Sequence, residues 1–266
     1  MHNYWYLRIK QWHYFWGVLI GIALVFIHLL VTLPPLVHYL DGNQYLFTPY
    51  TQWISFNTNA WTIALFLGMP LLSALSTSQL IGEDVRTGFY QHILQHKKQS
   101  NYLIKSLLIS FIGGALTIVI PLLIDFYGMW FFLPSIDPDI ILNSNLPLVP
   151  ATSYFSQLYY TNPNLLVSFY IGLAGLSAGI YAIFSSMIAL YTNNKFVSLG
   201  SGFVITMIFN VLSSAIPKTV FSPVLISIGL SPVYLPDLWT VLITYCVMLC
   251  IFIILGFYGG RKRAYI

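Results

Sequence analysis

Residues 82–105 read GEDVRTGFYQHILQHKKQSNYLIK, and this polar passage separates two apolar runs that are each long enough to cross a membrane. It holds four of the eleven Lys and Arg residues of the chain, and it opens with Glu83-Asp84 and closes with Lys97-Lys98. A helix dipole favours this order, with acids in the first turn and cations in the last. A narrow, partly apolar face recurs at helical spacing through the passage, formed by Val85, Phe89, Ile93 and His96. We therefore predict an amphipathic helix at about 83–98, outside the bilayer, as either a docking element for a soluble partner or a solvated connector.

Charged residues are scarce along the whole chain. Of its 266 residues, 58% are hydrophobic and 7% are charged, whereas an ordinary soluble domain has about 25% charged residues. So little charge leaves too little polar surface to cover a water-soluble protein of this size, so most of the surface must face lipid. The net charge of +4 follows from membrane topology and gives no indication of nucleic-acid binding.

The apolar runs predict a single all-α domain over residues 1–266, a polytopic membrane protein with six transmembrane helices. We place the spans at about 15–33, 60–81, 106–132, 165–191, 196–216 and 238–258. The aromatic-rich residues 2–16 precede the first span, with Trp5, Ile9, Trp12 and Trp16 on one helical stripe and Arg8 turned away from it, which predicts an in-plane helix at the membrane surface. Residues 217–237 are apolar but interrupted by four prolines, so we expect re-entrant or interfacial half-helices on the outer side, before the last span.

The distribution of cations orients these spans. With six spans both termini share one side, and ten cations fall on that side: Arg8, Lys10, Arg86, Lys97, Lys98, Lys105, Lys195, Arg261, Lys262 and Arg263. Only Lys218 falls on the other side. Because cytoplasmic loops carry the excess of Lys and Arg, we predict that the termini and the polar passage are cytoplasmic.

Few residues suggest chemistry within the spans. Asp125 is the only acid inside an apolar run and is therefore a candidate functional residue. It lies near the outer end of its span, where we expect it to reach interfacial water, so a structural or entrance role is favoured over proton coupling. His92 and His96 lie four residues apart but lack a third ligand nearby, so we expect no metal site.

Known catalytic motifs are absent from the sequence. It contains no phosphate-binding loop of the GxxxxGK[ST] kind, no HExxH and no GxSxG. We therefore expect that this chain is not an enzyme by itself.

The polar passage also contains a local sequence pattern. It is formed by Glu83, Thr87-Gly88, Ile93-Leu94, Tyr102 and Lys105. Together with six spans, an in-plane N-terminal helix and a broken segment before the last span, it resembles the membrane subunit (permease) of a type-2 ATP-binding-cassette (ABC) exporter. In that family an acid, a small residue with glycine, an apolar pair and a basic residue run through the same loop. The arginine-proline step that is common there is replaced here by Gln95-His96.

The resemblance implies specific roles for two parts of the chain. The polar passage would be the coupling helix that seats in a groove of a separate cytoplasmic ATPase subunit, through Glu83, Asp84, Arg86, Phe89, His92, Ile93 and His96. The segment 217–237 would close the exit path, with Asp125, Pro223 and Pro232 along the substrate path or gate. ATP and Mg would bind in the ATPase subunit, and no cofactor is expected in this chain. Two permease copies, identical or paralogous, would pair with two ATPase subunits.

The expected function is ATP-driven transport out of the cell or out of the membrane, in a bacterial plasma membrane. Many aromatic residues and short hydrophilic loops favour an amphipathic or hydrophobic substrate. The first choice is an antimicrobial or toxin-like peptide, for export or self-immunity, followed by a drug or a lipid-linked molecule. An ion-gradient-driven secondary carrier is an alternative, but it requires paired polar groups in mid-membrane, and the sequence shows none. A non-transporting sensor or anchor is the remaining alternative.

Overall fold

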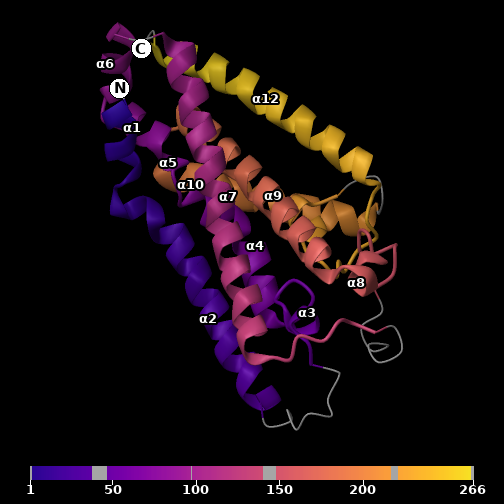
Figure 1. Cartoon of the computed structure of the whole chain (residues 1–266). Helices are drawn as coiled ribbons and strands as arrows, with labels where there is room; N and C mark the ends of the chain where they lie inside the picture. Colours follow the sequence, from indigo (N-terminus) through magenta and orange to yellow (C-terminus); the bar gives the residue numbers. More distant parts are fainter. Residues whose placement is uncertain (1, 38–46, 97, 140–147, 217–220, 265–266) are drawn as a thin grey trace.

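The computed structural model describes residues 2–37, 47–96, 98–139, 148–216 and 221–264. Within these residues every regular element is helical (Figure 1). In chain order the elements are α1 (His2–Ile9), the 3-10 turn η1 (Trp12–Phe15), α2 (Trp16–Val37), α3 (Pro49–Gln52), α4 (Ala60–Ala74), α5 (Gln79–Arg86), α6 (Phe89–His96), α7 (Gln99–Phe132), α8 (Leu158–Thr161), α9 (Pro163–Tyr191), α10 (Lys195–Ala215), α11 (Pro223–Ile226) and α12 (Leu238–Ala264).

Six helical stretches of the described chain are long and apolar enough to span a membrane, which confirms the predicted multi-pass character. They cover Trp12–Val37, Ala60–Arg86, Gln99–Phe132, Pro163–Tyr191, Lys195–Ala215 and Leu238–Lys262. The two ends of the chain lie close together at one end of the helical body, as an even number of crossings requires (Figure 1).

Helix α9 is the centre of the body. In its most apolar window 89% of residues are buried within the chain, against 22% for α10 and 11% for α12. Small residues allow close packing there: a Cβ added to Gly114 of α7 would lie 2.3 Å from Cβ of Ala182 of α9. Helices α10 and α12 therefore leave most of their surface to lipid or to another chain.

The predicted span at 60–81 lies within the apolar stretch Ala60–Arg86, but this stretch is not one continuous helix. Helix α4 ends at Ala74 and α5 begins at Gln79. Serine hydroxyl groups donate hydrogen bonds to backbone carbonyl oxygens around this break. Ser76 Oγ donates to Ser73 O at 2.6 Å, and Ser78 Oγ donates to Ala74 O at 2.6 Å. Such partners make irregular backbone tolerable at membrane depth, because carbonyl oxygens in lipid must be hydrogen-bonded within the protein.

The predicted amphipathic helix at 83–98 is also interrupted. Helix α5 ends at Arg86 and α6 begins at Phe89, because Gly88 adopts a positive φ of 74° that ends a helix. The Thr87 N–H donates to Glu83 O at 2.9 Å and completes the last turn of α5. Glu83 and Asp84 consequently lie near the C-terminal end of a helix, where the helix dipole disfavours carboxylates. The prediction of a single helix with its acids in the first turn is therefore wrong.

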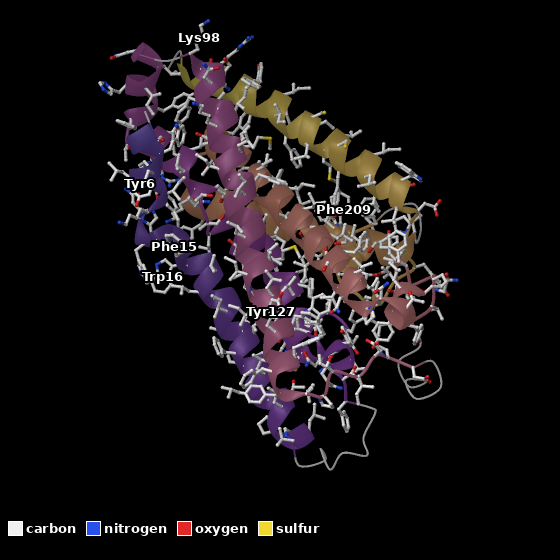
Figure 2. The ribbon with its side chains drawn as sticks, in the orientation of Figure 1. Tyr6, Phe15, Trp16, Lys98, Tyr127 and Phe209 are labelled. Atoms are coloured by element: carbon white, nitrogen blue, oxygen red, sulfur yellow. The ribbon has the colours of Figure 1, made fainter. Side chains whose placement is uncertain are left out.

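The N-terminal segment differs from the predicted continuous helix at 2–16. Helix α1 ends at Ile9 and Gln11 is extended, so the tryptophans do not share one stripe. Trp5 is buried and its ring stacks on Tyr102 with centroids 5.7 Å apart, whereas Trp12 and Trp16 are exposed. Tyr6 and Trp16 lie along the outer side of the body in Figure 2. Arg8, expected to turn away from the stripe, instead pairs with Asp84.

Three segments pack together at the end of the body away from the termini, and we call residues 48–57, 149–161 and 221–236 the distal cap. The Gly229 N–H donates to Ser55 Oγ at 2.8 Å, and the Leu235 N–H donates to Ala151 O at 2.9 Å. The predicted half-helices of the segment 217–237 are reduced in its described part to the single turn α11, with residues 217–220 outside the described chain.

Candidate functional site

The two acids of α5 are held by the N-terminal segment, far away in sequence. Asp84 is fully buried; its carboxylate forms an ion pair with Arg8 of α1 and accepts a hydrogen bond from the Tyr102 hydroxyl of α7 at 2.5 Å. An acid without counter-charge at this depth would be costly, so the guanidinium and the hydroxyl together explain why a carboxylate is tolerated. The pair joins α1, α5 and α7.

Glu83 makes a second, more exposed set of contacts with the same segment. His13 Nε2 lies 3.0 Å from Glu83 Oε1, and the Tyr14 hydroxyl donates to Glu83 Oε2 at 2.7 Å. Arg8 Nη2 lies 3.8 Å from the same Oε2. The side chain of Glu83 is only 20% exposed. Both acids thus face α1 and η1, so the N-terminal segment is fixed to the polar passage.

An aromatic layer beneath the acids extends this junction to the last helix. Tyr90 of α6 packs edge-on against Tyr102, with ring centroids 5.6 Å apart. The Tyr90 hydroxyl donates to Gly260 O of α12 at 3.2 Å and accepts from Gln99 Nε2 at 3.2 Å. Burial raises the pKa of Tyr90 above its ordinary value. A displacement of α6 would therefore be felt by α7 and α12 as well as by α5.

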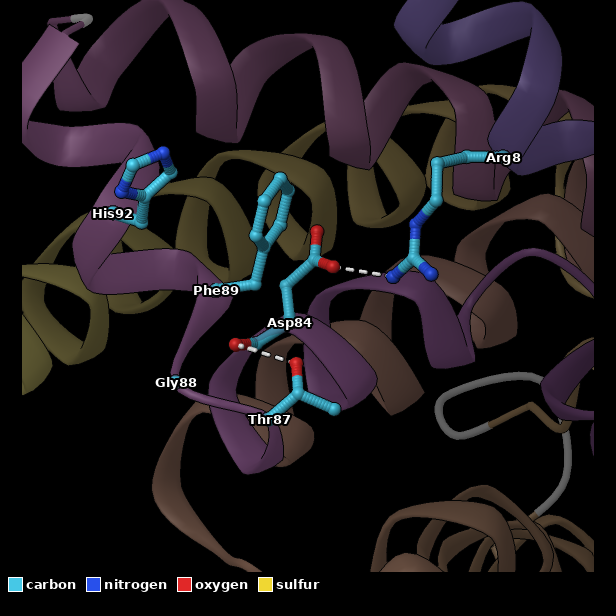
Figure 3. Close-up of a pocket in the computed structure, with 6 residues that line it drawn as sticks. All are labelled: Arg8, Asp84, Thr87, Gly88, Phe89 and His92. Carbon is cyan, nitrogen blue, oxygen red and sulfur yellow. Dashed lines mark hydrogen bonds and ion pairs between the residues drawn. The ribbon is translucent and has the colours of Figure 1, made fainter.

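An open groove of about 480 Å³ lies beside this junction, lined by Arg8, Asp84, Thr87, Gly88, Phe89 and His92 (Figure 3). The figure shows the Phe89 ring between His92 and the carboxylate of Asp84. Phe89 is 37% exposed, and its ring centroid lies 5.9 Å from that of His92. The groove offers an aromatic and imidazole wall at one side and a compensated ion pair at the other.

The predicted docking residues differ in exposure in the structure. Phe89 and His92 are exposed, whereas Asp84 and Ile93 are buried within the chain. Glu83 and Arg86 are half-buried, and the side chain of His96 lies outside the described residues. Of the predicted docking residues, Phe89 and His92 are therefore the ones exposed to a partner, beside the exposed turn at Thr87-Gly88, and the acids hold this turn in place from behind.

Asp125 does not reach interfacial water, which corrects that expectation. Its side chain is fully buried, with Oδ1 at 2.7 Å from His28 Nδ1 and Oδ2 accepting from the Ile54 N–H at 2.8 Å. His28, which lies alone among apolar residues in its span, had given no reason to expect this partner. The available signal was that a lone histidine and a lone acid in two different spans are each costly in lipid and so tend to pair.

The three residues expected along a substrate path are not gathered into one cavity. Pro223 begins α11 and lines a cavity of about 220 Å³ between α9, α10 and α12, together with Tyr181, Phe209 and Phe252. Apart from the Tyr181 hydroxyl, the lining of this cavity is apolar. Pro232 is exposed in the distal cap, and Asp125 is bound to His28 on the other side of the body formed by α2 and α7.

Two features thus stand out: a polar junction beside an open groove at the end that carries the termini, and a buried histidine–carboxylate pair near the opposite end. Comparison of this chain with models of protein families, with curated proteins and with solved structures finds no match.

Proposed function

We propose that this chain is the membrane subunit of an ATP-driven exporter of the type-2 ABC kind, in a bacterial plasma membrane. The observation that carries the proposal is the groove at Thr87–Phe89 and His92, which opens beside the junction of α1, α5, α6 and α7. A surface element of this kind is suited to receive movement from a soluble subunit, because force applied to α6 reaches several spans at once.

Movement has a defined route through the described contacts. Phe89 and Tyr90 are adjacent, so a partner that displaces Phe89 also displaces the buried Tyr90 and its contacts with Tyr102 and Gly260. The turn at Gly88 transfers the same displacement to α5, and the ion pair between Asp84 and Arg8 transmits it to α1. In this proposal ATP closes two ATPase subunits, which move the groove elements of two permease copies and open a path between them.

Membrane orientation and substrate follow from the same proposal. In this proposal the groove and both termini lie in the cytoplasm, where ATP and Mg bind to the partner subunit, and the excess of cations in the predicted connecting segments supports this orientation. The apolar cavity beside Pro223 suits an amphipathic or hydrophobic substrate, for which a peptide remains our first choice. The poorly buried helices α10 and α12 leave apolar surface for a second permease copy or for lipid.

The test begins with isolation of the chain from its native membrane and identification of an ABC ATPase that co-purifies with it. Phe89→Ala and His92→Ala should each weaken ATPase binding by about tenfold, since one truncated contact at the centre of an interface costs about 1–2 kcal/mol. Phe131→Ala is the matched control, because Phe131 is 83% exposed at the opposite end of α7 and should leave binding unchanged.

Isolation of the stable chain with no ATPase partner, or unchanged binding in both groove variants, would refute the proposal. Proteoliposomes then separate the alternatives. Flux driven by an ion gradient without ATP identifies a secondary carrier, and no flux under either condition identifies a sensor or an anchor.

A further inference from the structure

His28 of α2 and Asp125 of α7 form a buried pair in which one atom is left over. Both side chains are fully buried. Each carboxylate oxygen of Asp125 has one partner, His28 Nδ1 at 2.7 Å and the Ile54 N–H at 2.8 Å. The second ring nitrogen, His28 Nε2, is buried and has no hydrogen-bond partner among the described residues. A buried polar atom without a partner is uncommon and calls for an explanation.

The number of protons on the pair determines its net charge and whether Nε2 carries a hydrogen. With a single proton shared between Nδ1 and Oδ1, the pair carries a net charge of −1 and Nε2 is bare. With one more proton the pair is neutral, either as imidazolium with carboxylate or as imidazole with carboxylic acid. In both neutral forms the hydrogen bond between Nδ1 and Oδ1 is kept and Nε2 carries a hydrogen. The charged and the neutral form of the pair therefore differ by a hydrogen at Nε2.

The helices that pack most extensively on α2 and α7 bring no acidic or basic side chain. They are α4, which has no titratable side chain, and α9, whose titratable side chains are Tyr170, Tyr181 and Tyr191. The segment 48–57 has only Tyr50. The Tyr50 hydroxyl donates to Asn164, away from the pair. On α7 the nearest cation is Lys105, twenty residues from Asp125 and so about 30 Å along the helix.

We propose that His28 and Asp125 form a proton-binding site that is occupied when the distal cap is closed and releases its proton when the cap opens. The closed arrangement excludes water, and a net charge of −1 in such a place is strongly disfavoured, so the closed site retains the second proton. Opening admits water, which solvates the charge and accepts the proton from Nε2.

The cap segment 48–57 is the element that links occupancy to closure. Ile54 donates its N–H to Asp125, and the neighbouring Trp53 donates its ring N–H to Leu122 O of α7 at 3.3 Å. Trp53 and Ile54 are both fully buried, so they cover the pair on the side of the cap. Separation of this segment from α7 breaks both bonds and exposes the carboxylate. Protonation and cap closure therefore favour each other, as linkage requires.

The experiment uses the full chain in lipid nanodiscs without any ATPase, so that its result is independent of the proposed function. Ring ¹⁵N resonances of labelled histidine are recorded from about pH 5 to 10, and His28 is identified by its absence in His28→Gln. Hydrogen exchange of the peptide that contains Ile54 is measured over the same range and corrected for the intrinsic pH dependence of exchange.

The expected result is that Nε2 of His28 loses its proton as the pH rises, and that protection of the Ile54 peptide falls at least tenfold at the same midpoint. In Asp125→Asn the pair is neutral without a second proton, so the step in protection should disappear. Asp137→Asn, which changes an exposed acid beyond the end of α7, should keep the step.

An Nε2 that stays protonated, or stays bare, over the whole range would overturn the proposal, because the pair would then be a fixed structural link. Titration of Nε2 without a change in protection would overturn the coupling to the cap. Both results are obtained on the wild-type chain, so they decide the matter even if Asp125→Asn fails to fold.

Discussion

Removal of the Asp84 carboxylate is the sharpest test of the polar junction. Asp84→Ala deletes the ion-pair partner of Arg8 and the acceptor of the Tyr102 hydroxyl. Loss of one member of a buried pair costs about 3–5 kcal/mol, because the remaining charge is left without compensation. Arg8 keeps 20% of its side chain exposed and retains Glu83 Oε2 at 3.8 Å, so we expect a loss at the low end of this range, about 3 kcal/mol, in the free energy of unfolding.

Smaller changes divide this loss into its parts. Tyr102→Phe removes a single hydrogen bond to a carboxylate, for which about 1.5 kcal/mol is expected, since Arg8 still compensates Asp84. A double-mutant cycle of Arg8→Ala and Asp84→Ala should give a coupling of about 1–3 kcal/mol. Asp137→Ala changes an exposed acid and should stay within about 0.5 kcal/mol of wild type.

The assay is reversible unfolding of the chain in mixed micelles, followed by circular dichroism across a denaturant titration. If Asp84→Ala lost less than about 1 kcal/mol and the cycle showed no coupling, the reasoning would fail. The acids would then not hold the N-terminal segment against α5, and the proposed route from the groove to α1 would be lost.

Two further predictions use the same unfolding assay. Gly114→Ala should destabilise the chain by about 1–3 kcal/mol, because the new Cβ would lie 2.3 Å from Cβ of Ala182. The control Gly172→Ala places its new Cβ in open space and should be neutral or slightly stabilising. Equal effects of the two substitutions would contradict the close packing of α7 on α9. Burial raises the pKa of Tyr90, so the unfolded chain ionises this hydroxyl first as the pH rises, and stability should fall above about pH 10. Tyr90→Phe should lose less stability than wild type between about pH 9 and 11, and parallel profiles would show that the hydroxyl is not buried in solution.

The sequence predicted the lipid environment of this protein better than the contacts between its residues. Long apolar runs and a content of 7% charged residues predicted that most of the protein surface faces lipid. The described chain has six helices long and apolar enough to span a membrane. The polar passage was also found from composition alone. Its division at Gly88 was not predicted, although a glycine with a positive φ commonly follows the end of a helix.

The partners of the polar residues could not be derived from the sequence. The helical stripe of tryptophans placed Arg8 on the side away from Trp5, but the two residues are three positions apart in α1 and share a helix face, and Arg8 pairs with Asp84, seventy-six positions away. His28 and Asp125 are ninety-seven positions apart, and neither has a local partner that would indicate the other. Pairing of this kind depends on which helix faces lie against each other, and helical periodicity within one segment carries no such information.

By itself, the sequence determined that the chain has six helices long and apolar enough to cross a membrane, and that one polar segment, residues 82–105, separates two of them, because the transfer of apolar and charged groups is a property of each segment alone. Only the tertiary structure decided where the charges of that segment are directed, where the second span breaks and which histidine meets which carboxylate. Those outcomes depend on the packing of α2, α7 and α9 around one another, since a buried charge or free carbonyl selects its partner from whatever the neighbouring helices bring within about 3 Å.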